Sequence, residues 1–253
     1  MPLVSVIMPA YNCEATIRMS IQSALRQTLD NLELIVVDDC STDRTSDIIA
    51  ELAITDLRLK HLTNPKNSGV ASTRNRAIDA SSGEFLAFLD SDDMWEPDKL
   101  EKQLTLMRET GCVLCYASYD YFGSNGRPVY RPYLVPETID YNGLLKENVI
   151  GLSTVVLRRD TLGRLKFDEG IFHEDFALWL QLLREGVTAF GIPEVLSHNR
   201  IGGRSQNKWV AMKNRWRVYR VCEGLPVWAA CWYLLVYAMA GMRKYRRRAA
   251  IGS

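Results

Sequence analysis

The sequence lacks the glycine-rich motifs of two common nucleotide-binding classes. No G-x-x-x-x-G-K-[S/T] string occurs, which excludes a P-loop enzyme. The first predicted strand-to-helix turn, residues 9–12, reads Pro-Ala-Tyr-Asn without G-x-G-x-x-G, which argues against a dinucleotide dehydrogenase. Any nucleotide that binds to this chain is therefore held in another way.

Cysteine pairs, leader segments and repeats are also scarce. The single C-x-x-C, Cys112 to Cys115, lies in an apolar run, and no second cysteine or histidine pair completes a zinc site. We therefore interpret both cysteines as buried strand residues. The first residues form a strand-like run followed by charges and do not resemble a signal peptide, which predicts a cytoplasmic protein. Neither an internal repeat nor a low-complexity tract is present.

The composition is ordinary for a globular protein, but the charge is unevenly distributed. The 253 residues are 47% hydrophobic and 24% charged, which suits one large domain with a small appendage. Ten of the 31 lysines and arginines, but one of the 30 acidic residues, lie in residues 207–253, so this tail carries +9 and the rest −8. We therefore predict a body domain, residues 1–206, and a basic tail, residues 207–253, that binds a polyanionic surface.

Hydrophobic periodicity predicts strands and helices in alternation. Continuous apolar runs predict strands at residues 3–8, 32–37, 59–62, 85–89, 113–118 and 154–157. Apolar side chains at a spacing of three to four predict helices at residues 14–27, 43–53, 69–80, from 97 onward, and 175–185. This order predicts an α/β fold with a mainly parallel sheet and helices on both faces. Residues 119–149 are interpreted as an irregular loop that faces a ligand.

Acidic residues gather where predicted elements meet. The clusters are Asp38-Asp39, Asp90-Ser91-Asp92-Asp93 and Glu174-Asp175. In open α/β sheets, ligands bind beyond the carboxyl ends of the strands. Three carboxylates within four residues repel one another unless a cation neutralises them, and carboxylates suit Mg²⁺ or Mn²⁺, which keep room for phosphate oxygens. We therefore predict a metal–diphosphate site at residues 90–93, in preference to a solvated turn.

Five segments, in order, resemble the motifs of family 2 glycosyltransferases over residues 3–185. They are residues 4–12 (VSVIMPAYN), 37–43 (VDDCSTD), 69–75 (GVASTRN), 89–93 (LDSDD) and His173-Glu174-Asp175. The resemblance implies a GT-A fold, a divalent metal (Mn²⁺ or Mg²⁺), an inverting mechanism and a UDP-sugar donor. Similar small enzymes build bacterial O-antigen and other surface polysaccharides, which implies an acceptor sugar on a polyprenyl-diphosphate lipid.

The resemblance also implies residue roles. The nucleotide-sugar ligands would be Pro9, Tyr11, Asp39, Arg74, Asp90, Ser91 and Asp92. Asp90 and Asp92 would ligate the metal, and Asp175 would be the catalytic base that accepts the proton of the acceptor hydroxyl. Supporting roles would fall to Asp38, Asp93, Glu174, Arg200 and Arg204. Three alternatives stay open: Tyr11 as a packed turn residue, Arg74 as a partner of an acid, and Asp175 as a helix cap.

Residues 199–205 depart from the pattern that the family has in the loop after its last strand. Many relatives have an aromatic-Arg step and a later serine there, whereas this chain has Asn199-Arg200 followed by Gly202-Gly203-Arg204-Ser205. The two glycines predict a mobile loop that closes over the donor. Arg200 or Arg204 would then meet the diphosphate.

The tail is apolar and aromatic between two basic segments. Residues 225–242 hold no charge over 18 positions, near the lower limit of ~17–25 for a membrane-spanning helix. Pro226, the tryptophans and the flanking basic segments fit an interfacial helix on anionic lipid better. The alternative is a C-terminal helix packed on the body. No nucleic-acid partner is expected, because the tail matches no recognised binding module.

We therefore predict a hexosyltransferase that moves glucose or galactose from a UDP-sugar to a lipid-linked glycan, at the inner face of the cell membrane. A homodimer is left open. The alternatives are a non-catalytic protein that binds a nucleotide sugar or a membrane, and a metal-dependent phosphatase. Aspartyl-phosphate phosphatases place D-x-D-x-[T/V] after the first strand, whereas here residue 94 is Met94 and the motif follows the fourth. The phosphatase is therefore disfavoured.

Overall fold

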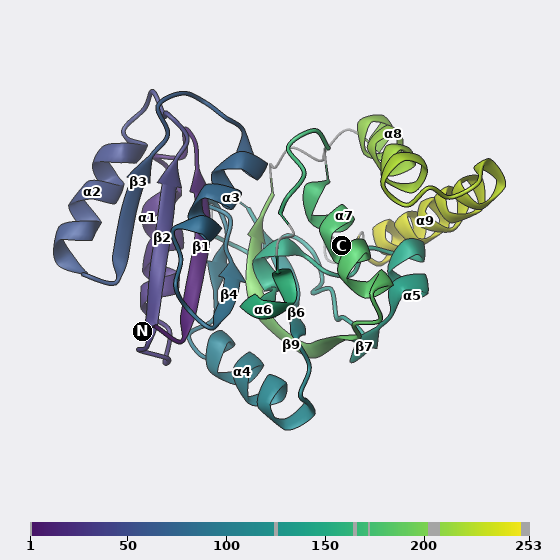
Figure 1. Ribbon diagram of the computed structural model, residues 1–253, viewed down its shortest axis with the longest axis horizontal. Coiled ribbons are helices and arrows are strands. Elements are labelled where there is room, and N and C mark those ends of the chain that lie inside the picture. The colour runs from purple at the N-terminus through teal and green to yellow at the C-terminus, as the bar shows by residue number, and fades with distance from the viewer. Residues whose placement is uncertain (1, 124–125, 164–165, 172, 202–207, 249–253) are drawn as a thin grey trace.

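The computed structural model describes residues 2–123, 126–163, 166–171, 173–201 and 208–248. Within these residues nine strands form one sheet in the order β3-β2-β1-β4-β8-β6-β9-β5, with β7 paired to β9 (Figure 1). The strands are β1 Val4–Ala10, β2 Leu32–Asp38, β3 Leu59–Thr63, β4 Phe85–Phe88, β5 Met94–Trp95, β6 Leu114–Phe122, β7 Thr138–Ile139, β8 Val156–Arg158 and β9 Ala189–Arg200.

Helices follow most of the strands. They are α1 Ile17–Leu25, α2 Thr45–Thr55, α3 Val70–Asp79, α4 Lys99–Thr110, α5 Tyr141–Lys146, α6 Arg159–Leu162, α7 Glu174–Arg184, α8 Lys208–Arg217 and α9 Val227–Arg248. A 3₁₀ turn, η1, spans Leu152–Thr154, and a π-helical turn, η3, spans Val218–Cys222. The predicted α/β fold is confirmed.

The sheet is parallel in its first half and mixed in its second. β3, β2, β1 and β4 run parallel, and β1 and β2 are buried on both faces along their whole length. Beyond β4 the pairings of β8, β5 and β7 are antiparallel, so four of the eight pairings are antiparallel. The prediction of a mainly parallel sheet is therefore wrong for this half. β8 overlaps the strand predicted at residues 154–157, but its antiparallel direction has no local signal, and β5 and β7 have two residues each, too few to give a periodic signal.

Helices cover both faces of the sheet, as predicted. Apolar residues of α1, α2 and α4 share one core with one face, and those of α3, α5 and α7 share a second core with the other. Cys115 is fully buried within β6 and Cys112 is buried just before it, and both thiols are free. Their interpretation as buried residues is confirmed for both, and as strand residues for Cys115 only, because β6 begins at Leu114.

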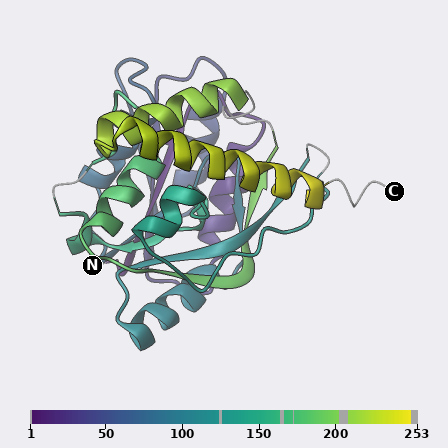
Figure 2. The same ribbon diagram turned by 90° about the vertical axis from the view of Figure 1, so that its right-hand side faces the viewer.

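The tail packs against the body through the second core. Val218, Tyr219 and Ala230 are buried in it, and Tyr219 donates a hydrogen bond to the Leu145 carbonyl at 2.6 Å. The Arg215 guanidinium lies 4.0 Å from the ring centres of both Phe176 and Tyr237, which joins α8, α7 and α9. Figure 2 shows α9 crossing this side of the molecule beside α8. In the part of the chain that is described, no helix is long and apolar enough to cross a membrane.

The predicted loop at residues 119–149 contains regular structure. β6 continues to Phe122, and the returning chain pairs with it at Tyr119 and Tyr133 before β7 and α5. Asp140 caps α5 by accepting a hydrogen bond from the Gly143 amide at 2.7 Å. The sequence of this segment, rich in glycine and proline, has no strand periodicity. Its short strand β7 forms through pairing with β9, which lies far along the chain.

Candidate active site

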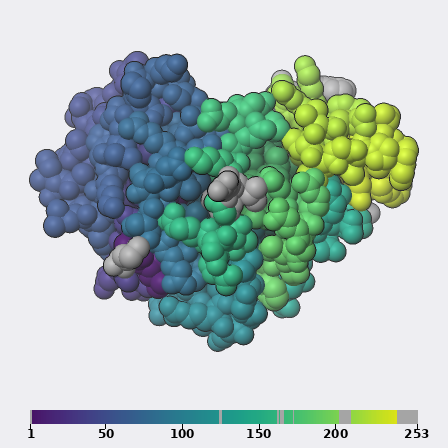
Figure 3. Space-filling model, in the orientation of Figure 1, coloured from purple at the N-terminus to yellow at the C-terminus, as the bar shows by residue number. Residues whose placement is uncertain are grey.

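The carboxyl ends of β1, β2 and β4 meet at one edge of the sheet, which is the upper edge in Figure 1. The Asp39 amide donates to the Ala10 carbonyl at 2.8 Å, so the ends of β1 and β2 stay joined beyond the strands. Figure 3 shows that the surface is hollowed on this side, between the purple-to-blue and the green-to-yellow parts of the chain. All three acidic clusters predicted from the sequence lie at or near this edge.

The loop of residues 90–93 is held from both ends. Asp93 is buried; one carboxylate oxygen accepts a hydrogen bond from the Ser153 hydroxyl at 2.6 Å and the other from the Arg200 amide at 3.0 Å. The Ser153 hydroxyl also accepts a hydrogen bond from the Asp90 amide at 3.1 Å. Burial, together with the carboxylates of Asp90 and Asp92, raises the pKa of Asp93 well above its usual value. The buried Asp93 therefore resists ionisation beside these two carboxylates.

The chemistry of this loop fits a divalent cation that is completed by a ligand. Asp90 and Asp92 are partly exposed, whereas Asp93 is turned inward to Ser153 and Arg200. Among the described residues no three His, Cys, Asp or Glu side chains form a closed metal site. Mg²⁺ is typically held by one or two carboxylates together with waters and substrate phosphates. Asp90 and Asp92 are thus the residues that would hold a cation, with a diphosphate as the further ligand.

Arg74 joins this loop to the start of α7. Its guanidinium donates to Asp90 at 2.7 Å and to Glu174 at 2.5 Å, and it is almost fully buried. One guanidinium charge is thereby shared between two carboxylates in a region of low dielectric. Arg74 is therefore hydrogen-bonded to two carboxylates. This geometry favours the interpretation of Arg74 as a partner of acidic residues over its direct contact with a nucleotide.

Asp175 lies in the first turn of α7, beside Glu174. Burial and the neighbouring Glu174 carboxylate raise the pKa of Asp175 to about 6. Its carboxylate accepts a hydrogen bond from the Phe176 amide at 2.7 Å, so it also satisfies one free amide of the helix start. The preceding His173 has a φ of 77°, a left-handed conformation that is strained for a residue with a side chain. Such strain is typical of functional sites.

Hydrogen bonds join the loop after β1 to the loop after β2. Asn12 accepts a hydrogen bond from the Thr42 amide at 2.8 Å, and Asn12 and Cys40 are both left-handed, with φ of 45° and 61°. The Asp38 carboxylate accepts a hydrogen bond from the Ser41 hydroxyl. Asp38 thus stabilises the loop after β2, and its predicted supporting role at a donor site stays a prediction.

The other predicted nucleotide ligands differ in exposure. Tyr11 is half exposed, Pro9 is buried in β1, and the Ser91 hydroxyl contacts the Cys13 thiol. Asp39 is buried and accepts hydrogen bonds from Asn64, Ser68 and Gly69 at 2.7–2.9 Å. Three of the roughly four lone-pair positions of the Asp39 carboxylate are therefore occupied by donors that precede α3. A bond from Asp39 to a base stays a prediction.

Of the two arginines predicted to meet the diphosphate, Arg200 lies within the described residues. Arg200 ends β9, and its amide contacts Asp93, which places this residue beside the aspartate loop. Arg204, and the loop closure that the glycines at 202 and 203 predict, lie outside the described residues.

The sequence reasoning missed two polar groups behind the aspartate loop. Ser153 hydrogen-bonds to Asp93 although the two residues lie 60 positions apart in the sequence, and no local pattern marks Ser153. His198 lies between Asp120 at 2.7 Å and Glu96 at 2.8 Å, and these carboxylates raise the pKa of its imidazole. The triad ties the chain that follows the aspartates to β6 and β9. The pairing of β5 with β9, which forms it, has no signal in the sequence.

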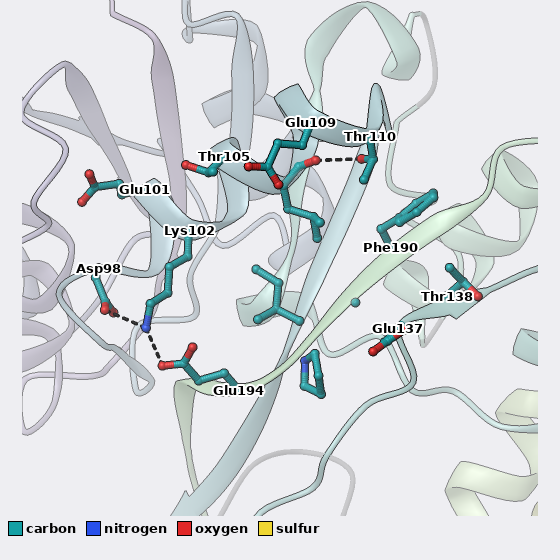
Figure 4. Close-up of a pocket in the computed structure, with 14 residues that line it drawn as sticks. Asp98, Glu101, Lys102, Thr105, Glu109, Thr110, Glu137, Thr138, Phe190 and Glu194 are labelled. Carbon is teal, nitrogen blue, oxygen red and sulfur yellow. Dashed lines mark hydrogen bonds and ion pairs between the residues drawn. The ribbon is translucent and has the colours of Figure 1, made fainter.

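A cavity of about 740 Å³ lies elsewhere, between α4 and the start of β9 (Figure 4). Five carboxylates surround it, and its one amine, Lys102, is already paired with Asp98 and Glu194. A nucleoside diphosphate would be repelled there. None of the predicted site residues lines this cavity, and so it is not the candidate active site.

Known proteins resemble this chain over most of its length. Residues 5–171 match the model of glycosyl transferase family 2. The chain is 39% identical over 246 residues to the UDP-Glc:alpha-D-GlcNAc-diphosphoundecaprenol beta-1,3-glucosyltransferase WfgD of Escherichia coli, covering 96% of this chain and 95% of WfgD.

Solved structures share the fold. S. aureus TarS 1-349 in complex with UDP-GlcNAc has a TM-score of 0.70 at 25% identity, over 88% of this chain and 65% of TarS. The mannosyltransferase PcManGT from Pyrobaculum calidifontis, in complex with GDP-Man and Mn²⁺, has a TM-score of 0.70 at 20% identity, over 100% of this chain and 76% of PcManGT. The second likeness shows the fold alone. The family match spans the loops that carry Asp39, Arg74 and Asp92, and this chain belongs to the family 2 glycosyltransferases.

Proposed function

We propose that this chain is an inverting, metal-dependent hexosyltransferase that moves glucose or galactose from a UDP-sugar to a hydroxyl of a polyprenyl-diphosphate-linked glycan. The proposal rests chiefly on the two hydrogen bonds that the Arg74 guanidinium donates, one to Asp90 and one to Glu174. They join the candidate donor site at Asp90 to the helix start that carries the candidate base Asp175. The names of WfgD, a glucosyltransferase for a lipid-linked GlcNAc, and of the TarS complex with UDP-GlcNAc support this donor and acceptor.

The residues divide the reaction between them. Asp90 and Asp92 would hold the cation, which when bound supplies Lewis-acid neutralisation of the departing diphosphate. Asp175 accepts the proton of the acceptor hydroxyl while that oxygen bonds to the anomeric carbon and the bond from this carbon to the diphosphate oxygen breaks. Attack opposite the leaving group inverts the anomeric centre. With a pKa of about 6, Asp175 is ionised at neutral pH and still basic enough to take the proton.

The donor side would be completed by the first two loops. Tyr11, half exposed, offers a ring face on which a nucleobase stacks. Asp39 is held next to it, since its amide donates to the Ala10 carbonyl and its carboxylate accepts the Gly69 amide at the start of α3. Arg74, occupied by two carboxylates, orients Asp90 and Glu174 rather than the diphosphate.

Metal removal tests the reaction. Purified protein is incubated with a panel of UDP-sugars and a synthetic GlcNAc-diphosphate-lipid, and products are identified by mass spectrometry. We expect transfer of one hexose with Mn²⁺ or Mg²⁺, loss of transfer in EDTA, and recovery on adding excess cation. Transfer that is equal in EDTA would contradict the metal dependence. Release of inorganic phosphate without sugar transfer would favour the phosphatase, and binding without turnover would favour the non-catalytic protein.

We propose further that the tail attaches the enzyme to anionic lipid at the inner face of the cell membrane. One face of α9 packs on the body through Ala229 and Ala230. The opposite face carries Trp228, Trp232 and Leu235, whose exposures are 75%, 56% and 54%. Their spacing places them on one stripe of the helix. Five of the six residues at 243–248 are basic, which complements an anionic surface.

Vesicle binding tests the tail. The double variant Trp228→Ser/Trp232→Ser is expected to bind vesicles containing phosphatidylglycerol at least about tenfold more weakly, because burying one large apolar side chain is worth about 1.5–3 kcal/mol. Co-sedimentation with phosphatidylcholine vesicles, with and without phosphatidylglycerol, measures the effect. The matched control is Ile54→Ser/Leu57→Ser, which removes two side chains of 84% and 94% exposure on and beside α2. Equal binding of both double variants would contradict the proposal. A dimer lost only in the tryptophan variant, without lipid binding, would make this stripe a contact between two copies.

A further inference from the structure

Ser153 connects two parts of the aspartate loop with one hydroxyl. The hydroxyl accepts the Asp90 amide at 3.1 Å and donates to the Asp93 carboxylate at 2.6 Å, and the residue is 2% exposed. A hydroxyl has one proton, so donation to Asp93 leaves its lone pairs for the Asp90 amide. The two ends of residues 90–93 are therefore held at a set separation, and Asp92 lies between them.

The main chain of Ser153 is fixed from the other side. Its carbonyl accepts a hydrogen bond from the Trp95 indole at 2.6 Å, and Trp95 is buried. The Lys99 amine, fully buried, lies 4.0 Å from the Trp95 ring centre and has no hydrogen-bond partner among the described residues. The stacked lysine holds the indole in place, because leaving this contact would leave the amine buried without any stabilising neighbour. Both polar groups of Ser153 are thus immobilised.

We propose that Ser153 is a positioning residue, which holds residues 90–93 in the geometry that binds the donor diphosphate together with its cation. This inference rests on the proposed donor site. Side chains and amides that orient metal ligands without touching the metal commonly set its affinity. Ser153 acts here through the Asp90 main chain and through Asp93, from a 3₁₀ turn that the fold places behind the loop.

Two measurements on Ser153→Ala test the role. In protein without donor or cation, the Asp90 amide is expected to exchange with deuterium faster, because it loses its acceptor. With Mn²⁺ present, calorimetry is expected to show UDP binding weakened about tenfold. In the transfer assay, the cation concentration for half-maximal activity is expected to rise by a similar factor, with a smaller change in kcat.

The matched control is Ser118→Ala. The Ser118 hydroxyl is also fully buried and also bridges two groups, since it accepts a hydrogen bond from the Val135 amide at 3.0 Å and donates to the Ile192 carbonyl at 3.3 Å. Both partners of the Ser118 hydroxyl lie outside residues 90–93, so its variant is expected to lose stability while keeping wild-type cation affinity and wild-type exchange at Asp90.

The outcomes separate this inference from the proposed function. If the wild type binds UDP with Mn²⁺ and Ser153→Ala behaves as Ser118→Ala does, Ser153 is only a packing residue and the inference is overturned. If the wild type shows no cation-dependent UDP binding, the proposed function fails, and the Asp90 exchange rate still reports whether Ser153 holds the loop. Should Ser153→Ala not fold, Trp95→Phe keeps a smaller aromatic ring and removes the indole N–H that donates to Ser153, and the same two shifts are expected; their absence there overturns the inference.

Discussion

Replacing Asp175 by asparagine is expected to lower kcat by about 10²- to 10⁴-fold, the range for loss of a general base. Asparagine keeps a side-chain oxygen that can accept the Phe176 amide, so the hydrogen bond at the start of α7 survives while the base is lost. Steady-state kinetics of transfer and calorimetry of UDP binding are the measurements. Donor affinity should stay near that of the wild type, because the proposed donor contacts lie in other loops.

The dependence of kcat/KM on pH gives a second test of Asp175 as the general base. The pKa of Asp175 is raised to about 6, so this group is protonated and inactive as a base below that pH and ionised above it. For the wild type, kcat/KM should therefore fall about tenfold per pH unit below pH 6 and level off above it, since kcat/KM reports groups of the free enzyme. The residual activity of Asp175→Asn should lack this acid limb.

Asp140→Asn is the control for the helix-capping interpretation. Asp140 also stands at a helix start and accepts an amide, that of Gly143 at 2.7 Å, but it belongs to α5. Its variant should keep wild-type kcat. If Asp175→Asn also keeps wild-type kcat, Asp175 is a capping residue and the base must be sought elsewhere at the carboxyl edge.

Removing the Asp92 carboxylate is expected to have the second large effect. Asp92→Ala should lower kcat/KM on the order of 10³-fold, because a cation that neutralises the leaving diphosphate supplies several kcal/mol and each 1.36 kcal/mol is a factor of ten. UDP binding should also become insensitive to Mn²⁺. Titration of UDP into the variant, with Mn²⁺ and with EDTA, measures this directly.

Asp98→Ala is the matched control for this change. Asp98 lies six residues further on and pairs with Lys102 at the rim of the distant cavity, so its loss should alter neither the Mn²⁺ dependence nor the turnover. An Asp92→Ala enzyme that turns over normally, or a wild type that binds UDP-sugars equally well in EDTA, would refute the metal–diphosphate site.

The first half of the fold could be predicted well because its signals are local. β1 and β2 are continuous apolar runs that are buried on both faces, and Ile17, Ile21 and Ala24 form the buried stripe of α1 at the spacing that predicted a helix. Parallel strands bring their carboxyl ends to one edge, so the convergence of the Asp39 and Asp90 loops followed from the order of the elements.

The second half could not be predicted in the same way. β5 and β7 have two residues each, and what makes them strands is a partner far along the chain. β8 was predicted as a strand, but its antiparallel pairing with β4 was not. The tail shows the same limit, because an apolar aromatic helix suits both a membrane surface and a protein core. α9 has one face packed on the body and one exposed, and only the packing of Ala230 and Tyr237 reveals which is which.

By itself the sequence determined the family, the α/β order and the acidic residues at the carboxyl edge, because these depend on residue type and on spacing within one segment. The tertiary structure alone decided the partners of those acids. It paired Arg74 with Asp90 and Glu174, and set Ser153 behind the aspartate loop. It also set Asp175, which is partly buried, next to Glu174, and both the burial and the neighbouring carboxylate raise its pKa. Hydrogen bonds, burial and pKa values depend on groups up to a hundred residues apart, whose meeting no local pattern encodes.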